Sequence, residues 1–308
     1  MQKIIDQPTN APPGADGLEA LALRASHWAG EPFLHEGEEI SAALAPGTAR
    51  RRALDEAVAE MDAGRAEPST EWKVRFSLML GLERVLSEKP PHLASGTELR
   101  RHQIDALAGM LTELIAANQR EHENGNGHNG HAEVVEEDEE DEEEIEGEID
   151  ELEEASEPDP GAVRRYRFRH PTASGKTIAA AGFVEAARSI GVLILTHRRL
   201  LVNQFRRELI DEGYGRRLTP EIVDGKAHAA DPITIQTYAW FARHVGDLQR
   251  DAYQLVICDE AHTALGEKTS AAIRSFPEPI YIGMTATEQL IAKQVSDVFP
   301  DAVGWRKR

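Results

Sequence analysis

The sequence predicts an α/β fold built around a parallel sheet and preceded by a helical region. From Arg164 onward, short apolar runs such as GVLILT, PITIQTY and YQLVICDE alternate with helical stretches. This alternation is typical of β-α-β units, whose parallel strands are covered on both faces. Before that point, Ala-rich segments carry apolar residues at helical spacings. An acidic stretch that is too polar to form a core separates the two parts.

The formal net charge of −20 is concentrated in one segment. Of the 54 acidic residues, 18 lie between Glu133 and Asp159, where there is no Lys or Arg, which leaves 36 acidic against 34 basic residues elsewhere. The single cysteine, Cys258, excludes an internal disulfide and a Cys-based zinc site, and fits a reducing compartment. No apolar run approaches the ~18 residues of a membrane span, so we expect a cytoplasmic protein without a membrane partner.

The composition predicts five segments along the chain. A loose tail rich in Pro, Asn and Gly comes first, and the paired prolines of SEKPPHLASG mark the end of the helical region. The apolar residues of LRRHQIDALAGMLTELIAANQ can share one face of a further helix. We expect a flexible tail at 1–16, a helical N-terminal region at 17–90, a helix at 97–120, a disordered acidic linker at 121–163 and the α/β domain at 164–308.

The first strand of the α/β domain carries an unusual charge pattern. RRYRFRH places Arg165, Arg167 and Arg169 in what should be a central strand, where buried charge is costly unless it is paired. Either the strand starts late, with only 168–171 central, or one of its faces is open. A third possibility is that the acidic stretch folds back on these arginines and occludes them. A plain solvated spacer is the favoured interpretation of that stretch.

HPTASGKT, at 170–177, indicates a phosphate-binding loop. In such a loop, backbone N–H groups and a helix start wrap a polyphosphate, a lysine reaches the terminal phosphates and a hydroxyl ligates Mg²⁺. Gly175, Lys176 and Thr177 supply the last glycine, the cation and the hydroxyl, and IAAAGFVEAAR follows as a helix. A helix start with an exposed lysine is the alternative interpretation of this stretch taken alone.

A second element, YQLVICDEAH, is an apolar strand that ends in two carboxylates. The strand would place Asp259 at the carboxyl edge of the sheet, where it can hold Mg²⁺. Glu260 beside it can orient and deprotonate a water. Cys258 is predicted to be a small core residue, because no partner base is signalled near it.

HPTASGKT, CDEAH and MTATE, in this order, resemble the first RecA-like domain of superfamily 2 helicases and translocases. Within that superfamily the sequence resembles the DEAD/DEAH-box-like group that includes type III restriction enzyme motor subunits, and the resemblance covers roughly residues 97 to 300. It implies a RecA-like P-loop NTPase fold with ATP and Mg²⁺ as cofactors. His170 fits this group, which often lacks the first loop glycine, whereas Ala173 replaces a usual glycine and adds a Cβ near the phosphates.

The resemblance implies roles for individual residues. The nucleotide would be contacted by Gln103, Thr172, Ala173, Ser174, Gly175, Lys176 and Thr177. Magnesium would be held by Thr177 and Asp259, and hydrolysis would need Glu260, Lys176 and His262. The nucleic-acid backbone would be contacted by Thr196, Arg198, Gln204, Thr234, Gln236 and Thr237, and coupling to hydrolysis would involve Thr285 and Thr287. For either nucleic-acid motif taken alone, strand caps and surface polar residues would be the favoured interpretation, and only the order of the motifs favours function.

The resemblance also implies an incomplete motor. A superfamily 2 motor places ATP between two RecA-like domains, and the chain stops at VFPDAVGWRKR, where the second domain should begin. We therefore expect the ATP-binding and ATP-hydrolysing half of a helicase or translocase, completed by a second RecA-like domain in trans. DNA is expected over RNA by analogy with restriction motors.

Two other functions remain open at this point. One is a truncated adaptor that binds nucleotide or a partner protein without hydrolysis. The other is a phosphate-loop enzyme unrelated to nucleic acid, which would require the ordered motifs between the loop and DEAH to be accidental. Stimulation of ATP hydrolysis by DNA or RNA would distinguish both from the helicase interpretation.

Overall fold

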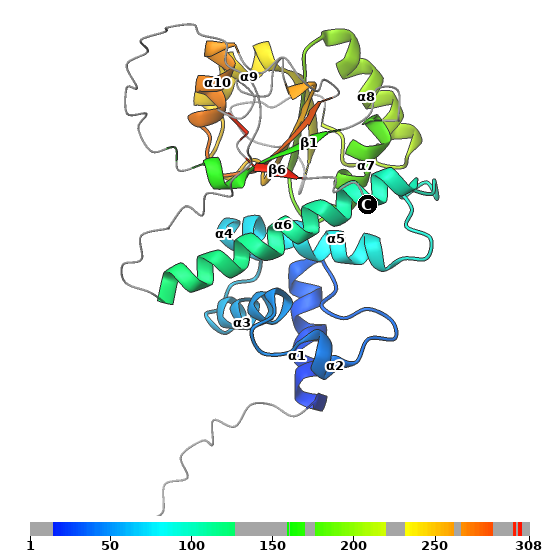
Figure 1. Cartoon of the computed structure of the whole chain (residues 1–308), viewed down its shortest axis with the longest axis vertical. Coiled ribbons are helices and arrows are strands. Elements are labelled where there is room, and N and C mark those ends of the chain that lie inside the picture. Colours follow the sequence, from blue (N-terminus) through cyan, green and yellow to red (C-terminus); the bar gives the residue numbers. More distant parts are fainter. Residues whose placement is uncertain are drawn as a thin grey trace, which may run out of the picture.

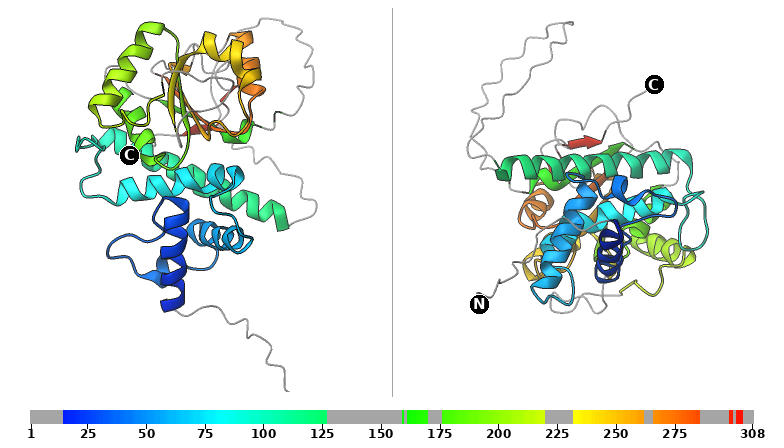
Figure 2. Two further views of the ribbon diagram at one scale, coloured as in Figure 1. Left: turned by 180° about the vertical axis from the view of Figure 1, so that it is seen from behind. Right: turned by 90° about the horizontal axis from the view of Figure 1, so that it is seen from below.

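The computed structural model describes residues 15–126, 159, 161–169, 176–219, 232–261, 266–285, 298–299 and 301–303. Within these ranges the chain forms a parallel sheet with helices on both faces and a tier of N-terminal helices below it (Figure 1). The view from behind in Figure 2 shows the same tiers. The predicted α/β fold with a parallel sheet and a helical N-terminal region is confirmed.

The sheet has six described strands in the order β3-β2-β4-β5-β1-β6. Every neighbouring pair runs parallel, so the carboxyl ends of the strands lie at one edge. The strands β2 and β4 are buried at every position, as their continuous apolar runs predict. The bounds are β1 Arg165–Arg169, β2 Val192–Thr196, β3 Ile233–Thr237, β4 Leu255–Asp259, β5 Ile280–Thr285 and β6 Asp301–Val303.

Each face of the sheet has its own apolar core. On the first face, α7 (Lys176–Ala186) and α8 (Arg199–Asp211) pack on alternate strand residues such as Ile194 and Ile257. On the second face, α9 (Tyr238–His244) and α10 (Glu267–Arg274) pack on the strand residues between these. The alternation follows from the period of two along a strand, which sends neighbouring side chains to opposite faces.

The N-terminal helices belong to the core of the first face. Their buried residues form one continuous apolar cluster with α7 and the sheet. Trp72 is almost fully buried, and its ring lies 5.3 Å from Trp28 and 5.6 Å from Phe76, centroid to centroid. The bounds are α1 Ala15–Ala29, α2 Ile40–Ala43, α3 Ala49–Asp62, α4 Thr70–Trp72, the π-helical η1 Lys73–Ser77, α5 Leu78–Ser87 and α6 Arg101–Asn126.

The helix α7 is enclosed between the sheet and the helices α5 and α6. A Cβ on Gly81 of α5 would lie 1.7 Å from the carbonyl oxygen of Ala186, and a Cβ on Gly182 would lie 3.2 Å from Leu107 of α6. Only glycine allows two helix backbones to come this close. The helix that follows the predicted phosphate loop is therefore an interior element.

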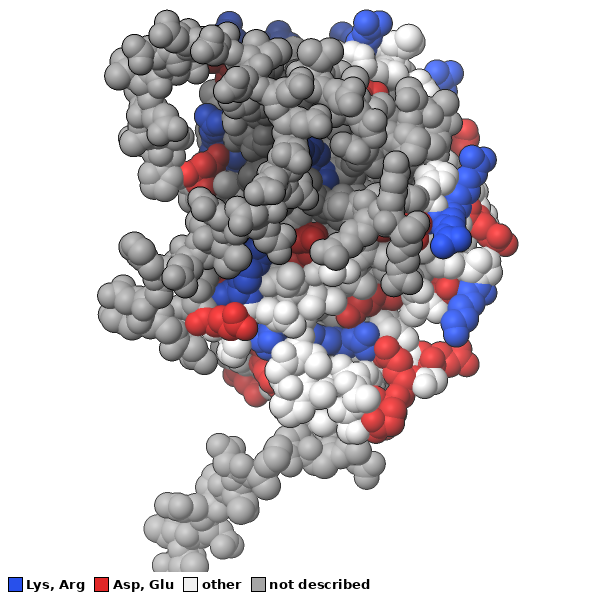
Figure 3. Space-filling view, viewed as in Figure 1, with Lys and Arg blue, Asp and Glu red and all other residues white. Residues whose placement is uncertain are grey.

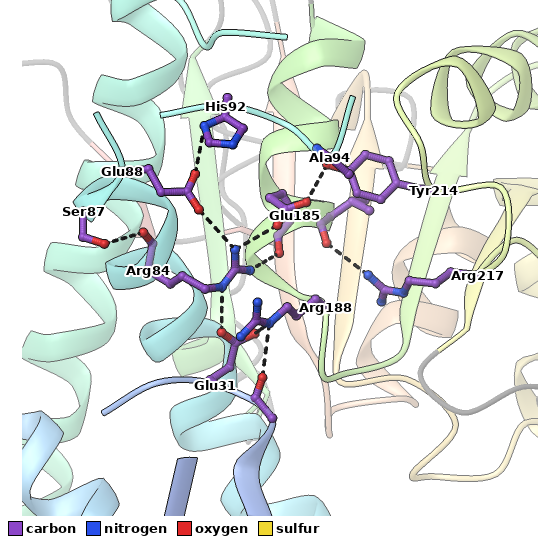
Figure 4. A network of polar contacts seen from close by, with 12 residues as sticks. Glu31, Arg84, Ser87, Glu88, His92, Ala94, Glu185, Arg188, Tyr214 and Arg217 are labelled. Carbon is purple, nitrogen blue, oxygen red and sulfur yellow. Dashed lines mark hydrogen bonds and ion pairs between the residues drawn. The ribbon is translucent and has the colours of Figure 1, made fainter. Parts of the chain in front are cut away.

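A buried polar network joins the N-terminal helices to α7 (Figure 4). Arg84 of α5 donates to Glu31 at 2.9 Å and to Glu185 of α7 at 2.8 Å, and Arg188 pairs with Glu31 at 3.1 Å. The hydroxyl of Tyr214, just beyond α8, donates to Glu185 at 2.8 Å. Burial raises the pKa of Glu31, although Arg84 and Arg188 oppose that shift.

The helix predicted at 97–120 begins and ends later in the structure. It begins at Arg101 and continues to Asn126, so 121–126 are helical although they were assigned to the acidic linker. The extra turn is stabilised because Glu121 pairs with Arg75 at 3.3 Å and Asn118 donates to the Arg75 carbonyl. Likewise α1 begins at Ala15, inside the predicted tail. Residues 1–14 and 127–158 lie outside the described ranges.

The buried charge at the start of β1 is compensated by an ion pair. The strand begins at Arg165, so of the alternatives considered from the sequence, the late start is wrong. The Arg165 side chain is fully buried, and its guanidinium pairs with Asp159 at 2.5 Å and lies 5.9 Å from the Tyr281 ring. Burial favours a higher pKa for Asp159, but the hydrogen bonds and charge of Arg165 outweigh it and hold the pKa below its ordinary value. The last residue of the acidic stretch therefore compensates the buried cation.

The described surface has no concentrated charge of one sign in the view of Figure 3, where basic and acidic side chains are interspersed. This distribution fits the near-neutral balance of the chain outside its acidic stretch. None of the helices in the described ranges combines the length and the apolar character needed to cross a bilayer.

Candidate functional site

The carboxyl edge of the sheet brings together several of the residues singled out in the sequence. Thr196, Thr237, Asp259 and Thr285 are the last residues of β2, β3, β4 and β5. Thr196 and Thr237 are register partners across β2 and β3. The helix α7 also begins at this edge, because it follows β1 and runs back toward the start of β2. Ligands of open parallel sheets bind at this edge.

The two predicted carboxylates lie in an unusual stretch of backbone. Asp259 ends β4 and is only 6% exposed, and half-buried Glu260 follows with a φ of 48°. Among the described residues, Glu260 is the only one other than glycine with a positive φ. The left-handed conformation costs a residue with a side chain roughly 1–2 kcal/mol. Such a conformation persists where its surroundings fix it, and it is frequent at functional sites.

The surroundings of this turn are close-packed. The Tyr238 hydroxyl donates to the carbonyl oxygen of Asp259 at 2.8 Å. Ala261 is buried against Gly283 of β5, where an added Cβ would lie 3.1 Å from the Ala261 Cβ and 3.2 Å from the Phe299 ring. Glycine at 283 therefore leaves the space that the turn after β4 occupies.

Cys258 lies in the core, as the sequence predicts. It is fully buried between β2 and β5, and burial raises the pKa of its thiol to about 12. A thiol that stays protonated is a poor nucleophile. The chemistry of this edge is therefore carried by oxygen groups.

The described residues at this edge fit a magnesium-bound nucleotide. Thr177 is half-buried in the first turn of α7, and Asp259 ends the central strand β4. Hydroxyl and carboxylate oxygens are the ligands that Mg²⁺ prefers, and a helix N-terminus attracts phosphate. Thr172, Ala173, Ser174, Gly175 and the side chain of Lys176 lie outside the described residues, so their contacts stay predictions.

Gln103 has a structural partner at the start of α6. Its side chain is buried, and its Oε1 accepts a hydrogen bond from the backbone N–H of Arg100 at 2.9 Å. This is half of a capping box, in which a residue in the first helical turn satisfies the N-cap amide. The structure therefore explains the burial of Gln103 by helix capping, and its contact with adenine stays a prediction.

The polar residues predicted to contact nucleic acid from β2 and α8 differ in exposure. Arg198 and Gln204 are exposed, and Gln204 donates to Glu208 on the same helix at 2.9 Å. Thr196 is buried, and within the described part of the chain its hydroxyl has no hydrogen-bond partner. An unsatisfied buried hydroxyl costs roughly 1–3 kcal/mol.

The residues predicted from β3 divide into two groups. Thr234 is buried, and its hydroxyl bonds to those of Tyr253 at 2.9 Å and Thr219 at 2.8 Å, so it faces the interior. Gln236 and Thr237 are half-buried at the end of the strand, and Thr237 caps α9 by accepting from the Trp240 amide. Only the last two residues are placed to meet a ligand at the edge.

Of the residues predicted to couple hydrolysis to nucleic-acid binding, the structure describes Thr285. Thr285 ends β5 with 7% of its surface exposed and pairs in register with Arg169 of β1. His262 and Thr287 lie outside the described residues. No role was predicted from the sequence for Tyr238, whose hydroxyl contacts Asp259. The available signal was a large aromatic residue at a strand end, directly after TIQT.

A family model described as "Type III restriction enzyme, res subunit" matches residues 97–290 of the 308. No curated protein matches the chain significantly.

Solved structures of helicases show partial likeness. The Pyrococcus furiosus Hef helicase domain matches with 20% identity and a TM-score of 0.39, over 46% of this chain and 35% of that one. The bacteriophage T4 UvsW helicase matches with 17% identity and a TM-score of 0.36, over 45% and 54%. The Sulfolobus solfataricus SWI2/SNF2 ATPase core, solved with dsDNA, matches with 16% identity and a TM-score of 0.36, over 44% and 30%. The chain thus spans about a third to a half of their lengths.

The family match begins just before α6, at Thr97, and runs beyond β5. It contains the phosphate-loop motif, the strand that ends in Asp259 and the residues at the end of β5. The chain therefore belongs to the type III restriction enzyme res subunit family, and it contains the first domain of a superfamily 2 helicase.

Proposed function

We propose that the chain binds ATP with Mg²⁺ at the carboxyl edge of its sheet and hydrolyses it as the first half of a DNA helicase or translocase. The observation that carries this proposal is the Asp259–Glu260 pair at the end of β4, at the same edge as the start of α7. Parallel sheets bind phosphorylated ligands at this edge, and a central strand ending in carboxylates suits a metal-bound phosphate.

Each residue has a defined task in this mechanism. Lys176 and the first backbone amides of α7 hold the phosphates, and Thr177 and Asp259 hold the metal. When bound, Mg²⁺ neutralises charge on the phosphate oxygens. Glu260 orients the attacking water and accepts its proton. Gln103 contacts the adenine, and His262, Thr285 and Thr287 couple hydrolysis to nucleic-acid binding.

The nucleic acid would lie along the ends of β2 and β3. Exposed Arg198 and Gln204 and half-buried Gln236 and Thr237 supply one cation, two amides and a hydroxyl, which suit sequence-independent contacts with a phosphate backbone. We place DNA before RNA because the family is described as a restriction enzyme subunit. Thr234 drops out of the proposed contact set, because its hydroxyl is engaged in the core.

Full turnover requires an arginine from a second RecA-like domain, which is typically worth ~10³-fold or more in rate. We propose that such a domain acts with this one, in the same protein or in trans.

Steady-state ATP hydrolysis and ATP binding, measured with and without DNA and RNA, test the proposal. The arms are the wild-type chain, Lys176→Ala and Glu260→Gln. We expect Mg²⁺-dependent ATP binding that Lys176→Ala abolishes, and any hydrolysis to rise with DNA and vanish in Glu260→Gln.

The outcomes separate the candidate functions. ATP binding without hydrolysis, even with the second domain supplied, would support the non-hydrolysing adaptor. Hydrolysis that no polymer stimulates would support a phosphate-loop enzyme unrelated to nucleic acid. ATP binding that survives Lys176→Ala would remove the site from this edge of the sheet.

A further inference from the structure

One hydrogen bond connects two strand ends that are not neighbours in the sheet. Tyr238 is the first residue of α9, directly after β3, and its hydroxyl donates to the Asp259 carbonyl oxygen at 2.8 Å. Strand β2 lies between β3 and β4 in the strand order. The bond therefore crosses β2 and ties the end of β3 to the end of β4.

The acceptor of this hydrogen bond lies next to a residue in a strained backbone conformation. The Asp259 carbonyl belongs to the peptide that joins Asp259 to Glu260, and Glu260 adopts a φ of 48°. A left-handed residue with a side chain is retained only if contacts fix the peptides around it. This peptide joins the Cα atoms of Asp259 and Glu260. Its orientation therefore determines the directions in which both carboxylates point.

The donor is rigid. Tyr238 is 4% exposed and packs in the apolar cluster of the second face with Phe241 and Cys258. A phenol has an ordinary pKa of about 10, so near neutral pH the hydroxyl is protonated and can donate. The backbone just before it is also fixed, because Thr237 caps α9.

We infer that Tyr238 is a positioning residue, which holds the Asp259–Glu260 peptide in the orientation that metal and water binding require, and links that peptide to the end of β3. This inference rests on the proposed function, in which Asp259 holds Mg²⁺ and Glu260 the attacking water. Partners that orient a metal ligand typically contribute 10–100-fold to metal affinity without touching the metal.

The same core supplies matched controls. Tyr253 and Tyr281 are fully buried in the same cluster and also use their hydroxyls as donors. Tyr253 donates to Thr234 at 2.9 Å, and Tyr281 donates to the Phe276 carbonyl at 2.7 Å. Neither of these two hydrogen bonds reaches Asp259, so the Phe variants of Tyr253 and Tyr281 measure what losing a buried hydroxyl does to the fold alone.

The test is the Mg²⁺ enhancement of ATP binding, defined as the ratio of the ATP dissociation constants in EDTA and in saturating Mg²⁺. This equilibrium quantity needs no second domain. We expect Tyr238→Phe to lower the enhancement about 10-fold while the dissociation constant in EDTA stays unchanged. Tyr253→Phe and Tyr281→Phe should leave the enhancement within about two-fold of wild type, and thermal unfolding of all variants verifies that they are folded.

Two results would overturn the inference: a wild-type enhancement in Tyr238→Phe, or the same loss in all three Phe variants. Asp259→Asn separates this from a failure of the proposed function. If Asp259→Asn loses the enhancement and Tyr238→Phe keeps it, only the role of Tyr238 is wrong. If Asp259→Asn or Lys176→Ala binds Mg·ATP as wild type does, the proposed site falls and the role of Tyr238 falls with it.

Discussion

The two faces of the sheet are covered to different depths. On the first face, α7 and α8 lie on the strands, and α7 is itself covered by α5 and α6, with the helices α1 to α3 beyond them (Figure 1). On the second face, α9 and α10 form the described cover. The first face buries the ion-pair network of Arg84, whereas the second face buries three tyrosine hydroxyls and the single ion pair of Arg165 with Asp159. The first face therefore buries more charged groups, and removing the partner of a buried charge is costly.

This difference assigns different tasks to the faces. The N-terminal helices close over the back of α7, so they are part of the fold that supports the predicted phosphate loop. The second face instead reaches the Asp259 carbonyl through Tyr238. Substitutions on the first face should change stability most, and those on the second should affect the site with a smaller loss of stability.

The largest loss of stability is expected for Arg84→Met. It leaves Glu31, whose side chain is fully buried, facing Arg188 alone and removes the ion pair with Glu185. Removing one partner of a buried pair costs about 3–5 kcal/mol. Urea unfolding measures this loss. Arg24→Met, which breaks an exposed 2.7 Å pair with Asp62, is the control and should cost at most about 1 kcal/mol. Equal losses in the two variants would contradict the account.

The next largest loss of stability is expected for Gly81→Ala. The added Cβ would meet the Ala186 carbonyl oxygen at 1.7 Å, so α5 must move away from α7. Overpacking of this kind costs about 3 kcal/mol. The control is Gly246→Ala, where no atom lies within 4 Å of the added Cβ. The melting temperature should fall in the first variant and hold in the second, and a wild-type melting temperature in Gly81→Ala would show that the two helices are not in close contact.

Asp159→Asn, on the second face, should lower the unfolding free energy by roughly 1.5–3 kcal/mol near neutral pH, because it removes the carboxylate that pairs with buried Arg165. The pKa of Asp159 lies below its ordinary value of 3.8, so its stabilising effect is complete above that pH and is lost as the pH falls below it. Urea unfolding over that range should show wild type and variant converging in acid. A constant difference would exclude the ion pair.

Arg198→Ala should have the smallest effect on stability, under about 0.5 kcal/mol, because the side chain is exposed and does not cap α8. If Arg198 contacts a phosphate, the slope of log affinity for DNA against log salt should fall by about one. Arg250→Ala is the control, since Arg250 precedes β4 at the opposite edge of the sheet. A salt titration of DNA binding compares the two variants, and identical slopes would remove Arg198 from the interface.

Much of the fold follows from sequence because buried parallel strands have continuous apolar runs. The runs ending in Thr196, Asp259 and Thr285 predicted β2, β4 and β5, and parallel order then placed their ends at one edge. The sequence therefore predicted the edge of the sheet at which the candidate site lies.

Other features depend on distant partners that periodicity does not reveal. Helical spacing shows that α5 is amphipathic, but it does not reveal that Arg84 meets Glu185 about a hundred residues later. The charged pattern of β1 was explained only by Asp159, and the last turn of α6 by Arg75. Tyr238 was missed because an aromatic residue after a strand normally indicates only core.

The most direct test of the account is calorimetric binding of Mg·ATP to wild type, Lys176→Ala and Arg84→Met, paired with urea unfolding of each without nucleotide. We predict that Lys176→Ala weakens binding at least about 30-fold, because truncating a charged contact costs at least about 2 kcal/mol, and leaves the unfolding free energy unchanged. Arg84→Met should chiefly lower that free energy. Wild-type affinity for Mg·ATP in Lys176→Ala would contradict the assignment of the nucleotide site.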